Sequence, residues 1–492
     1  MQGAAPHALR STDDGADADV LVVGGGLAGL ACAIALADEG LRVQVLEADD
    51  ELGGRARSRT DAAIGDRVDL GPHVLLSEYR NMLRLLDLLG TRANVVWDGR
   101  RFLTLIAPPR PATIRIAPLP APLHLLPSLL AAPQTSVADV LSNRRVLWHA
   151  MRLDENARRR LDATTGEAFL AECGVAAGFV DWFWRSAAMT VLNVPLERCS
   201  AAALIDVFRY LIGVSGFEVG FAGVGLGDLF ALPARRRLEA AGGRVLLRTC
   251  VERLSVGPGG VDGVRLVDGA ELRARRCVVA TPPAALLALL PDAWAARAEF
   301  ARLAALVPVP YVSTYLWFDE RLGERRCWTK TWSPHTLNYD FYDLANLRAG
   351  WERRGSLIAS NLIDARRAAS MSDDEIVAAT RRELAEYLPA AARATPRHVR
   401  VHRIPLAVHA ALPGIESLRV HATTPLRGLW IAGDWAATGV PMSMESAVRS
   451  GWLAAEAVLA DVGRPRTLAS PLPEMHGLVR LAGGRDARPG AT

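Results

Sequence analysis

Residues 20–29 read VLVVGGGLAG, and this stretch decides the fold. Its first four residues are apolar and mostly β-branched, which is typical of a buried parallel strand. Three glycines then complete the pattern G-x-G-x-x-G: Gly24, Gly26 and Gly29. The first permits a tight turn, the second lets a pyrophosphate approach the backbone, and the third lets the following helix pack on the strand. Apolar residues with helical spacing follow from Leu30, and Gly40 ends this predicted helix. The free N–H groups at its N-terminus would face the phosphate, with Leu27 and Ala28 among the residues expected to bind the cofactor.

A second apolar strand is predicted at residues 42–46, and it ends at Glu47. This acid stands 18 positions after Gly29, where a carboxylate can accept hydrogen bonds from both ribose hydroxyls of an adenosine. A G-x-G-x-x-G pattern alone is weak evidence, but strand, turn, helix, strand and acid occur here in order. The order predicts an α/β, Rossmann-like domain that binds a dinucleotide.

The next segment, EADDELGGRARS at residues 47–58, identifies the dinucleotide. A second glycine pair, at 53–54, precedes Arg55 and Arg57. In this motif the sequence resembles the superfamily of flavin amine oxidases and carotenoid desaturases. The resemblance implies FAD rather than NAD, held by a domain of the glutathione-reductase type. It also implies that Gly54, Arg55 and Arg57 meet the pyrophosphate, as backbone N–H groups and guanidinium groups can.

Two distant stretches fit the same superfamily: VDLGPHVLL at 68–76 and LWIAGDWAATGVPMSMESAVRSGWLAAEAVL at 429–459. The resemblance implies that the first brings three residues to the isoalloxazine ring: Gly71, Pro72 and His73. The second would contact the ribitol, the phosphate and flavin N1/O2 through five residues: Gly433, Asp434, Met442, Ser443 and Met444. Val251 would lie against the adenine and Thr281 beside the nucleotide. Because the C-terminal motif contains no cysteine, we expect the FAD to be bound non-covalently.

These motifs predict a discontinuous FAD-binding domain at residues 18–76, 234–285 and 420–463. Residues 77–233 and 286–419 would form a second, α+β and largely helical substrate domain. Its first predicted helix, SEYRNMLRLLDLLG at 77–90, has a candidate serine cap and a terminal glycine. Residues 1–17 are expected to be a disordered tail, and residues 464–492 a C-terminal tail.

Composition excludes several classes of function. The 492 residues are 50% hydrophobic and carry a net charge of +4 without a basic block, so no nucleic-acid partner is expected. The six cysteines form no C-x-x-C pair, which indicates reduced thiols in a cytoplasmic protein, and Cys250 and Cys277 are interpreted as core thiols. No metal site is predicted, since the histidines at 398–421 are too loosely spaced.

The segment at residues 107–133 is rich in proline, leucine and alanine. Such dense prolines forbid a long helix, yet the segment is too apolar for a solvated linker. Three interpretations remain open, namely packing on the protein's own core, wrapping of a hydrophobic cleft, and peripheral docking on the inner face of a membrane.

Within the superfamily the chain is most similar to hydroxysqualene dehydroxylases and to plant-type phytoene and ζ-carotene desaturases. The resemblance implies a hydrophobic isoprenoid substrate, hydride exchange at flavin N5 and an electron partner such as a quinone. Two features depart from the squalene-associated pattern. Residues 70–73 read LGPH instead of Asn-Gly-Gln-His, and residues 327–361 are rich in aromatic side chains that either line a pocket or form core. His73 is the candidate catalytic residue, with simple packing on the flavin as the alternative.

Two other functions are known for proteins of this fold. Amine oxidases of this fold generally carry a lysine on a substrate-domain strand, but the matching position here falls on or near Ser313, and the chain's one lysine, Lys330, lies outside that strand. Proteins of the GDP-dissociation-inhibitor type share the fold and bind prenyl groups without flavin chemistry. The complete glycine pattern, Glu47 and the motif at 433–434 argue against that class.

Overall fold

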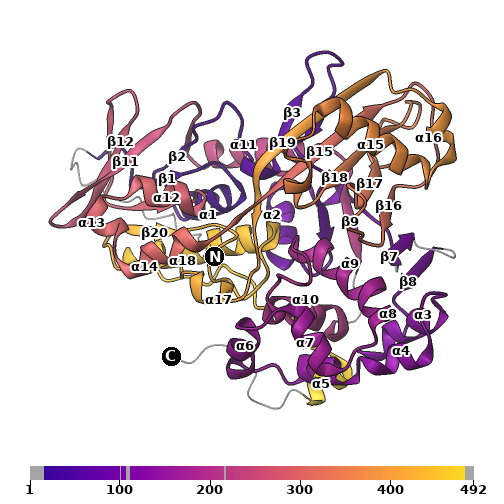
Figure 1. The fold of residues 1–492 in the computed structure, drawn as a ribbon. Coiled ribbons are helices and arrows are strands. Elements are labelled where there is room, and N and C mark those ends of the chain that lie inside the picture. Colours follow the sequence, from indigo (N-terminus) through magenta and orange to yellow (C-terminus); the bar gives the residue numbers. More distant parts are fainter. Residues whose placement is uncertain (1–15, 100, 107–110, 215–217, 483–492) are drawn as a thin grey trace, which may run out of the picture.

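The computed structural model describes residues 16–99, 101–106, 111–214 and 218–482, so most of the tail expected at 1–17 lies outside the described residues. Figure 1 shows one lobe built on a parallel sheet and another built on a mixed, mainly antiparallel sheet, with a group of helices below the second sheet. No helix in these ranges is long and apolar enough to cross a membrane.

A five-stranded parallel sheet forms the first lobe, in the order β10-β2-β1-β14-β20. Its strands are β1 (Val20–Val23), β2 (Val43–Leu46), β10 (Arg244–Leu246), β14 (Cys277–Val279) and β20 (Leu429–Ile431). Val20 and Val22 face one hydrophobic core, whereas Leu21 and Val23 face another, so the sheet is covered on both sides. Burial on both faces explains the continuous apolar run in β1 and confirms the predicted α/β fold.

Helices and a small antiparallel sheet supply the two covering layers. The first core contains residues of α1 (Leu27–Asp38), α11 (Leu232–Ala240) and α18 (Met444–Asp461). The second contains residues of β11 (Val251–Gly257), β12 (Gly260–Leu266), β13 (Glu271–Arg273), α12 (Pro283–Leu289) and α14 (Ala298–Ala301). The contact of α1 with α18 is very close, because a Cβ atom added to Gly451 would lie 2.2 Å from the Ala28 carbonyl oxygen.

The second lobe is organised around a seven-stranded sheet in the order β19-β15-β18-β17-β16-β7-β8. Its strands are β7 (Arg101–Ile106), β8 (Ala112–Arg115), β15 (Pro308–Trp317), β16 (Cys327–Lys330), β17 (Asp340–Asp343), β18 (Leu357–Leu362) and β19 (His398–His409). α15 (Asp373–Ala385) and α16 (Pro389–Arg393) share a core with one face of this sheet, which leaves the other face available to the site.

The helical part of this lobe surrounds a further core. It contains α3 (Leu126–Ala131), α4 (Val137–Ser142), α5 (Arg144–Met151), α6 (Glu155–Asp162), α7 (Gly166–Cys173), α8 (Ala177–Phe179), α9 (Arg185–Ala187) and α10 (Ala201–Gly213). The prolines at 107–133 limit that segment to short elements, as expected, although residues 107–110 lie outside the described residues.

A three-stranded sheet, β5-β9-β6, joins the two lobes. It consists of β5 (Val74–Leu76), β9 (Val219–Ala222) and β6 (Val95–Trp97), and α2 (Arg80–Leu89) follows β5. The expected glycine terminus of α2 is confirmed at Gly90, but the expected serine cap is wrong. The Ser77 hydroxyl accepts from the Glu218 N–H, and the Glu445 carboxylate of α18 instead accepts from the N–H groups at the start of α2, Asn81 and Met82.

The C-terminal segment differs from the tail that was expected at 464–492. The Ser470 N–H donates to the Asn81 side chain, and the Leu478 N–H donates to the Ala121 carbonyl. A short helix, α19 (Gly477–Ala482), contacts α5 and α10. Residues 464–482 are therefore packed on the domain. Their backbone N–H groups bind acceptors that lie far away in the sequence, and no local sequence pattern reveals such partners.

Candidate active site

One cavity of about 890 Å³ extends from the glycine turn at residues 24–29 to the seven-stranded sheet. Segments far apart in the chain line it: the turn, residues 47–57 and 71–79, the π-helical stretch around 183–193, and the start of α18. A dinucleotide site and a space lined by the second lobe are therefore continuous with each other.

The glycine turn has the close backbone contacts that its pattern predicts. Gly24 has φ +107°, and a Cβ atom there would lie 2.7 Å from the Ala280 carbonyl oxygen. A Cβ atom at Gly29 would lie 2.0 Å from the Gly24 carbonyl oxygen, so this glycine permits the packing of α1 on the turn. Gly26 is the N-cap of α1 and has no side-chain cap bond, which leaves the first N–H groups of the helix free for an anion in the cavity.

Glu47 lies at the end of β2 and lines the same part of the cavity. Its Oε2 accepts from the Gly25 N–H at 2.7 Å, and its Oε1 accepts from the Asp49 N–H at 2.9 Å. Each carboxylate oxygen has a further lone pair, so both can accept a ribose hydroxyl while the backbone holds the group in place.

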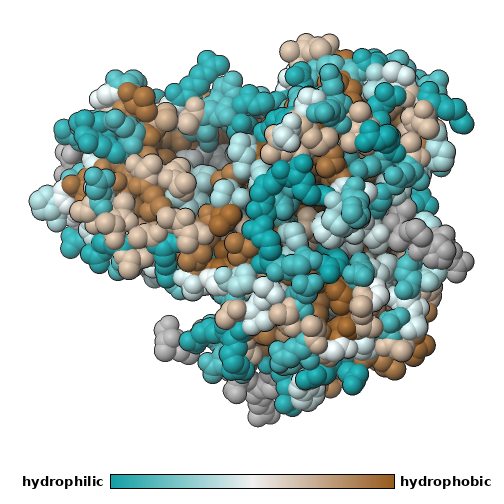
Figure 2. Space-filling view, in the orientation of Figure 1, coloured by the Kyte–Doolittle hydropathy of each residue, from teal (hydrophilic) through white to brown (hydrophobic). Residues whose placement is uncertain are grey.

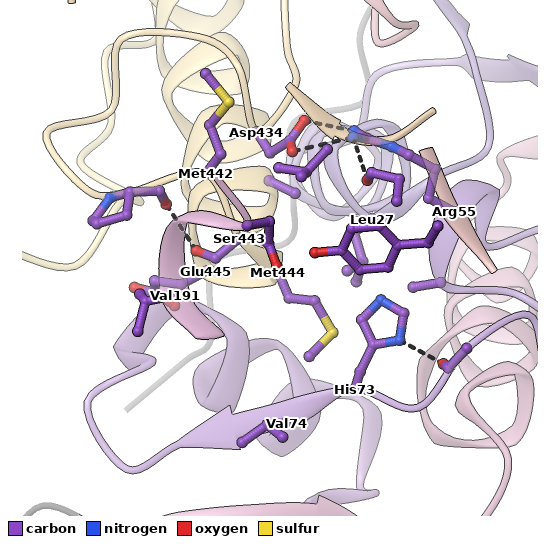
Figure 3. Close-up of a pocket in the computed structure, with 18 of the residues that line it drawn as sticks. Leu27, Arg55, His73, Val74, Val191, Asp434, Met442, Ser443, Met444 and Glu445 are labelled. Atoms are coloured by element: carbon purple, nitrogen blue, oxygen red, sulfur yellow. Dashed lines mark hydrogen bonds and ion pairs between the residues drawn. The ribbon is translucent and has the colours of Figure 1, made fainter. Parts of the chain in front are cut away.

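Arg55 and Asp434 form a two-contact ion pair across the cavity, with distances of 2.5 and 3.2 Å (Figure 3). Burial alone would raise the pKa of Asp434, but the Arg55 guanidinium, with His409 and Arg419, lowers it below its usual range. Arg57 is paired with Asp49 at 3.0 Å. The two arginines thus hold fixed positions beside the glycine turn, and each retains further N–H donors for a pyrophosphate.

His73 extends into the cavity from the loop between β4 (Arg67–Asp69) and β5, and Figure 3 shows its ring directed toward the same space as Met444. Its Nδ1 lies 2.8 Å from the Gly71 carbonyl oxygen, which can only accept. Nδ1 therefore carries the proton and Nε2 is left as an acceptor. Burial lowers the pKa of His73, so the ring is neutral at neutral pH.

The C-terminal loop at 433–443 is held by a residue that sequence reasoning missed. The buried guanidinium of Arg419 donates to the carbonyl oxygens of Ala436 and Val440 at 2.6 and 3.0 Å. Ser443, the N-cap of α18, accepts from the Ser446 N–H at 3.3 Å. A single arginine outside any motif carries no recognisable pattern, and only the folded loop brings these carbonyls to it.

One wall of the second half of the cavity is a single face of the seven-stranded sheet. The pairing register aligns Ser313, Asn361 and Asp340 across three adjacent strands, and all three line the cavity. Other cavity-lining residues from the same sheet are Leu105, Tyr311, Cys327, Thr329, Tyr342, Ile404, Ala407 and Val408. Sequence reasoning singled out Ser313, and also the aromatic residues at 327–361 that include Tyr342. It missed Asp340 and Asn361, because the row is assembled from separate strands with no common motif.

The aromatic residues at 328–351 take both of the expected roles. Tyr342 lines the cavity, whereas Trp328 and Phe341 are core residues on the opposite face of the sheet. Trp351 stacks with two arginines outside the cavity, Arg348 and Arg354. Successive side chains along β16 and β17 point to opposite faces of the sheet, so each aromatic residue there either lines the cavity or packs in the core behind the sheet.

The structure brings nearly all of the sequence-predicted site residues into this one cavity. Those that line it are Gly24, Gly26, Leu27, Ala28, Glu47, Gly54, Arg55, Arg57, Gly71, Pro72, His73, Val251, Thr281, Gly433, Asp434, Met442, Ser443 and Met444. Gly29 packs behind the turn instead. The core interpretation is wrong for Cys250, which is exposed and lines the cavity, and correct for Cys277, which is buried.

These residues fit FAD. The turn has no room for a Cβ atom at Gly24 or Gly29, whereas Gly26 faces the cavity and leaves its backbone open to a ligand. The uncapped end of α1 suits a pyrophosphate, and Glu47 has free acceptor sites for ribose hydroxyls. The cavity then continues past His73 to the start of α18, whose N-terminus favours negative charge on a reduced flavin. When bound, FAD supplies hydride exchange, and the chain's own residues would bind it, orient it and enclose it.

Comparison with known proteins agrees with this geometry. A family model described as flavin containing amine oxidoreductase matches residues 27–459. The chain belongs to this family. Membership makes it a flavin-containing oxidoreductase and sets aside the non-enzymatic prenyl-binding alternative. FAD is the cofactor that the family implies.

In sequence the chain is also similar to carotenoid desaturases. It is 27% identical to the 15-cis-phytoene desaturase of Capsicum annuum over 465 residues, covering 90% of this chain and 78% of that protein. It is 28% identical to the 15-cis-phytoene desaturase of Synechococcus elongatus, covering 92% of this chain and 98% of that protein. Among solved structures, cyclohexylamine oxidase from Brevibacterium oxydans superposes with a TM-score of 0.65 at 21% identity, covering 91% of this chain and all of that one. At this level of identity, the similarity to cyclohexylamine oxidase shows the fold alone.

Proposed function

We propose that this oxidoreductase acts on a hydrophobic isoprenoid, in the manner of a carotenoid desaturase or a hydroxysqualene dehydroxylase. The observation that carries the proposal is the continuity of one cavity. Its flavin end is formed by glycines, Glu47 and Arg55, whereas its far end is lined by side chains such as Phe183, Leu204 and Phe208. An apolar wall favours an apolar substrate, and the sequence relatives named phytoene desaturases support an isoprenoid.

The chain's own residues would orient that substrate and control proton transfer. An isoprenoid carries no group with a useful pKa, so the protein's part is chiefly to hold a chain against the flavin and exclude water. His73 is the proposed residue for accepting or returning a proton, because its neutral Nε2 is directed into the cavity. A quinone or another small electron carrier would exchange electrons with the flavin.

The FAD is proposed to be bound non-covalently. In the described part of the chain, two cysteines line the cavity, Cys250 and Cys327. Cys250 lies beside Val251, at the end of the cavity assigned to adenine, and Cys327 belongs to the sheet face of the second lobe. Neither stands in the loop at 433–443 that the flavin ring would approach. Acid precipitation of purified protein should therefore release all of the flavin into the supernatant.

Amine oxidation is a weaker candidate. Ser313, the position expected to match the amine oxidase lysine, lines the cavity, and its Oγ lies 2.7 Å from a Cβ added to Gly71. Lys330 ends β16 and its Nζ is bound to Glu386 at 2.6 Å. The chain's lysine is therefore engaged elsewhere and cannot hold a water molecule at the flavin.

Peripheral membrane contact is proposed for the helical part of the second lobe. Exposed apolar side chains gather there on the segment at 117–148: Leu119, Leu123, Leu130, Val137, Leu141 and Trp148. Figure 2 shows apolar residues at the lower right of the view, over α3 and α4. The Arg152 guanidinium stacks on the Trp148 ring at 4.0 Å, a pairing suited to an interface between lipid headgroups and acyl chains.

The proposal is tested by incubating the flavin-loaded enzyme with phytoene, hydroxysqualene and a panel of amines, each with a quinone or a reduced nicotinamide. Conversion of an isoprenoid, and not of the amines, is the expected result. The His73→Ala variant that retains its flavin should convert the same isoprenoid at least tenfold more slowly. Rapid oxidation of an amine with no isoprenoid turnover would contradict the proposal, and unchanged turnover by His73→Ala would remove this residue from the mechanism.

A further inference from the structure

Asp340 is an acidic group on the wall of the substrate end of the cavity, and the mechanism above gives it no role. It begins β17, is 8% exposed and faces the cavity in register with Asn361 and Ser313. Its Oδ2 accepts from the Tyr342 hydroxyl at 2.6 Å, and its Oδ1 accepts from the Asn361 N–H at 3.3 Å. Neither partner carries a positive charge.

The groups around Asp340 leave its charge uncompensated. Tyr339 and Tyr342 come from the same segment and Tyr311 from β15, while Thr329 on β16 is the residue paired with Asp340. No arginine, lysine or histidine in the described residues acts on this carboxyl group, although Arg326 lines the cavity, 3.9 Å from Asp98. Burial accordingly raises the pKa of Asp340 to about 6.

Tyr311 provides a second polar group in the same region. It lies two residues before Ser313 on β15, on the same face of the sheet, and lines the cavity. Burial, together with Asp340 and Asp364, raises its pKa well above the usual range, so its hydroxyl stays protonated. Within the described chain this hydroxyl has no hydrogen-bond partner, whereas the hydroxyls of Tyr339 and Tyr342 are both bound.

We propose that Asp340 and Tyr311 form a polar subsite that binds one oxygen atom, a carbonyl or a hydroxyl, of an otherwise apolar substrate. The carboxylic acid donates its proton and Tyr311 donates its hydroxyl hydrogen, while Tyr342 and Asn361 each donate to one oxygen of Asp340 and hold the group in place. A buried donor that finds no acceptor is costly, which gives the subsite selectivity against a pure hydrocarbon. The inference rests on the proposed function and specifies its substrate class as an oxygenated isoprenoid.

Ligand binding to the flavin-loaded enzyme tests this subsite, with the shift of flavin absorbance as the readout. The probes are farnesylacetone, an isoprenoid ketone, the hydrocarbon that lacks its carbonyl, and farnesylamine. A ketone oxygen only accepts, so it needs the protonated acid. At pH 5 the ketone should bind about tenfold more tightly than the hydrocarbon, and this ratio should fall toward one as the pH rises through about 6 and Asp340 loses its proton.

Single substitutions test which side chains produce the preference for the ketone over the hydrocarbon. Asp340→Leu should leave only the weaker, pH-independent ketone preference that Tyr311 supplies, Tyr311→Phe should reduce the preference at every pH, and Asp340→Asn should retain a preference that no longer depends on pH. Asp343→Asn is the matched control, because Asp343 is buried on the same strand but faces away from the cavity and is bound to Ser356. It should leave both the ratio and its pH dependence unchanged, at equal bound flavin.

Three results would overturn the inference. Equal binding of ketone and hydrocarbon at pH 5, with normal flavin shifts, would reject the subsite and leave the proposed function standing. Tighter binding of farnesylamine at pH 8 that is lost in Asp340→Leu would show an ionised carboxylate that selects amines. A flavin spectrum that none of the isoprenoids shifts would overturn the proposed function and the inference together.

Discussion

The carboxyl groups around the cavity differ in what surrounds them. Glu47 accepts from two backbone N–H groups, Asp434 is paired with Arg55, and Asp340 has only neutral donors beside it. The pKa of Asp434 is accordingly lowered, whereas that of Asp340 is raised. The same type of side chain can thus hold a ribose, fix an arginine or keep its proton up to a pH of about 6, and its neighbours decide which.

At this scale the clearest prediction concerns Glu47. Replacing it by alanine removes the acceptor of two ribose hydroxyls, and each such charged hydrogen bond contributes about 1.5–3 kcal/mol. Glu47→Ala should therefore bind FAD at least tenfold more weakly than the wild type, measured as the ratio of flavin to protein after gel filtration.

Glu51→Ala is the control for this variant. Glu51 is close in sequence but pairs with Arg67 and does not line the cavity, so flavin content should stay at the wild-type level. Full flavin occupancy in well-folded Glu47→Ala protein would refute the assignment.

Helix α18 performs several tasks in the fold. Its N-terminus closes the flavin end of the cavity, its Glu445 carboxylate accepts from the first N–H groups of α2, and its middle packs on α1. These contacts link the glycine turn at residues 24–29 with the C-terminal motif at 433–434. The two motifs lie about 400 residues apart in the chain, and both would face the FAD. The position of the helix against α1 is therefore tied to the shape of the flavin site.

The crossing of α1 and α18 predicts a sensitive glycine. A methyl group at Gly451 would meet the Ala28 carbonyl oxygen at 2.2 Å, which is backbone and cannot rotate away. Gly451→Ala should reduce the free energy of unfolding by about 1–3 kcal/mol through overpacking, and should lower flavin content as well. Chemical denaturation followed by circular dichroism, with and without added FAD, measures both effects.

Gly178→Ala serves as the matched substitution. Gly178 lies in α8, and nothing stands within 4 Å of its added Cβ atom. This change should leave stability unchanged or raise it by about 0.5–1 kcal/mol, because alanine favours a helix over glycine. Equal stability of Gly451→Ala and the wild type would show that the two helices can separate without cost.

At the scale of the whole molecule, the exposed apolar residues of the helical part predict attachment to lipid. Leu123, Leu130 and Leu141 belong to that surface. The wild type should co-sediment in part with anionic liposomes, and a triple replacement of these leucines by serine should reduce the bound fraction severalfold, because apolar burial drives such binding.

Val267→Ser tests whether any exposed apolar residue would have this effect. Val267 is 65% exposed and follows β12 in the FAD-binding lobe, away from the helical part. Its replacement should leave liposome binding unchanged. Equal sedimentation of the triple variant and the wild type would reject this surface as the lipid contact.

Local sequence determined the flavin end of the site and the fold around it. A buried parallel strand, a glycine turn, an acid at the end of the next strand and a second glycine pair are short-range features, because each depends on the backbone within a few residues. The structure places Gly24, Glu47 and Arg55 in one cavity, as these features predict. The motif at 433–434 lines the same cavity. FAD is a long molecule, so its binding site is built from both the N-terminal and the C-terminal parts of the chain.

Tertiary structure alone decided the rest. Asp340, Asn361 and Ser313 meet through strand register, Arg419 reaches its carbonyls through loop closure, and Glu445 replaces Ser77 as the cap of α2. Cys250 is exposed although its flanking sequence reads as a strand. These contacts join residues far apart in the chain, and their energy depends on how well separate elements pack, which no local pattern encodes.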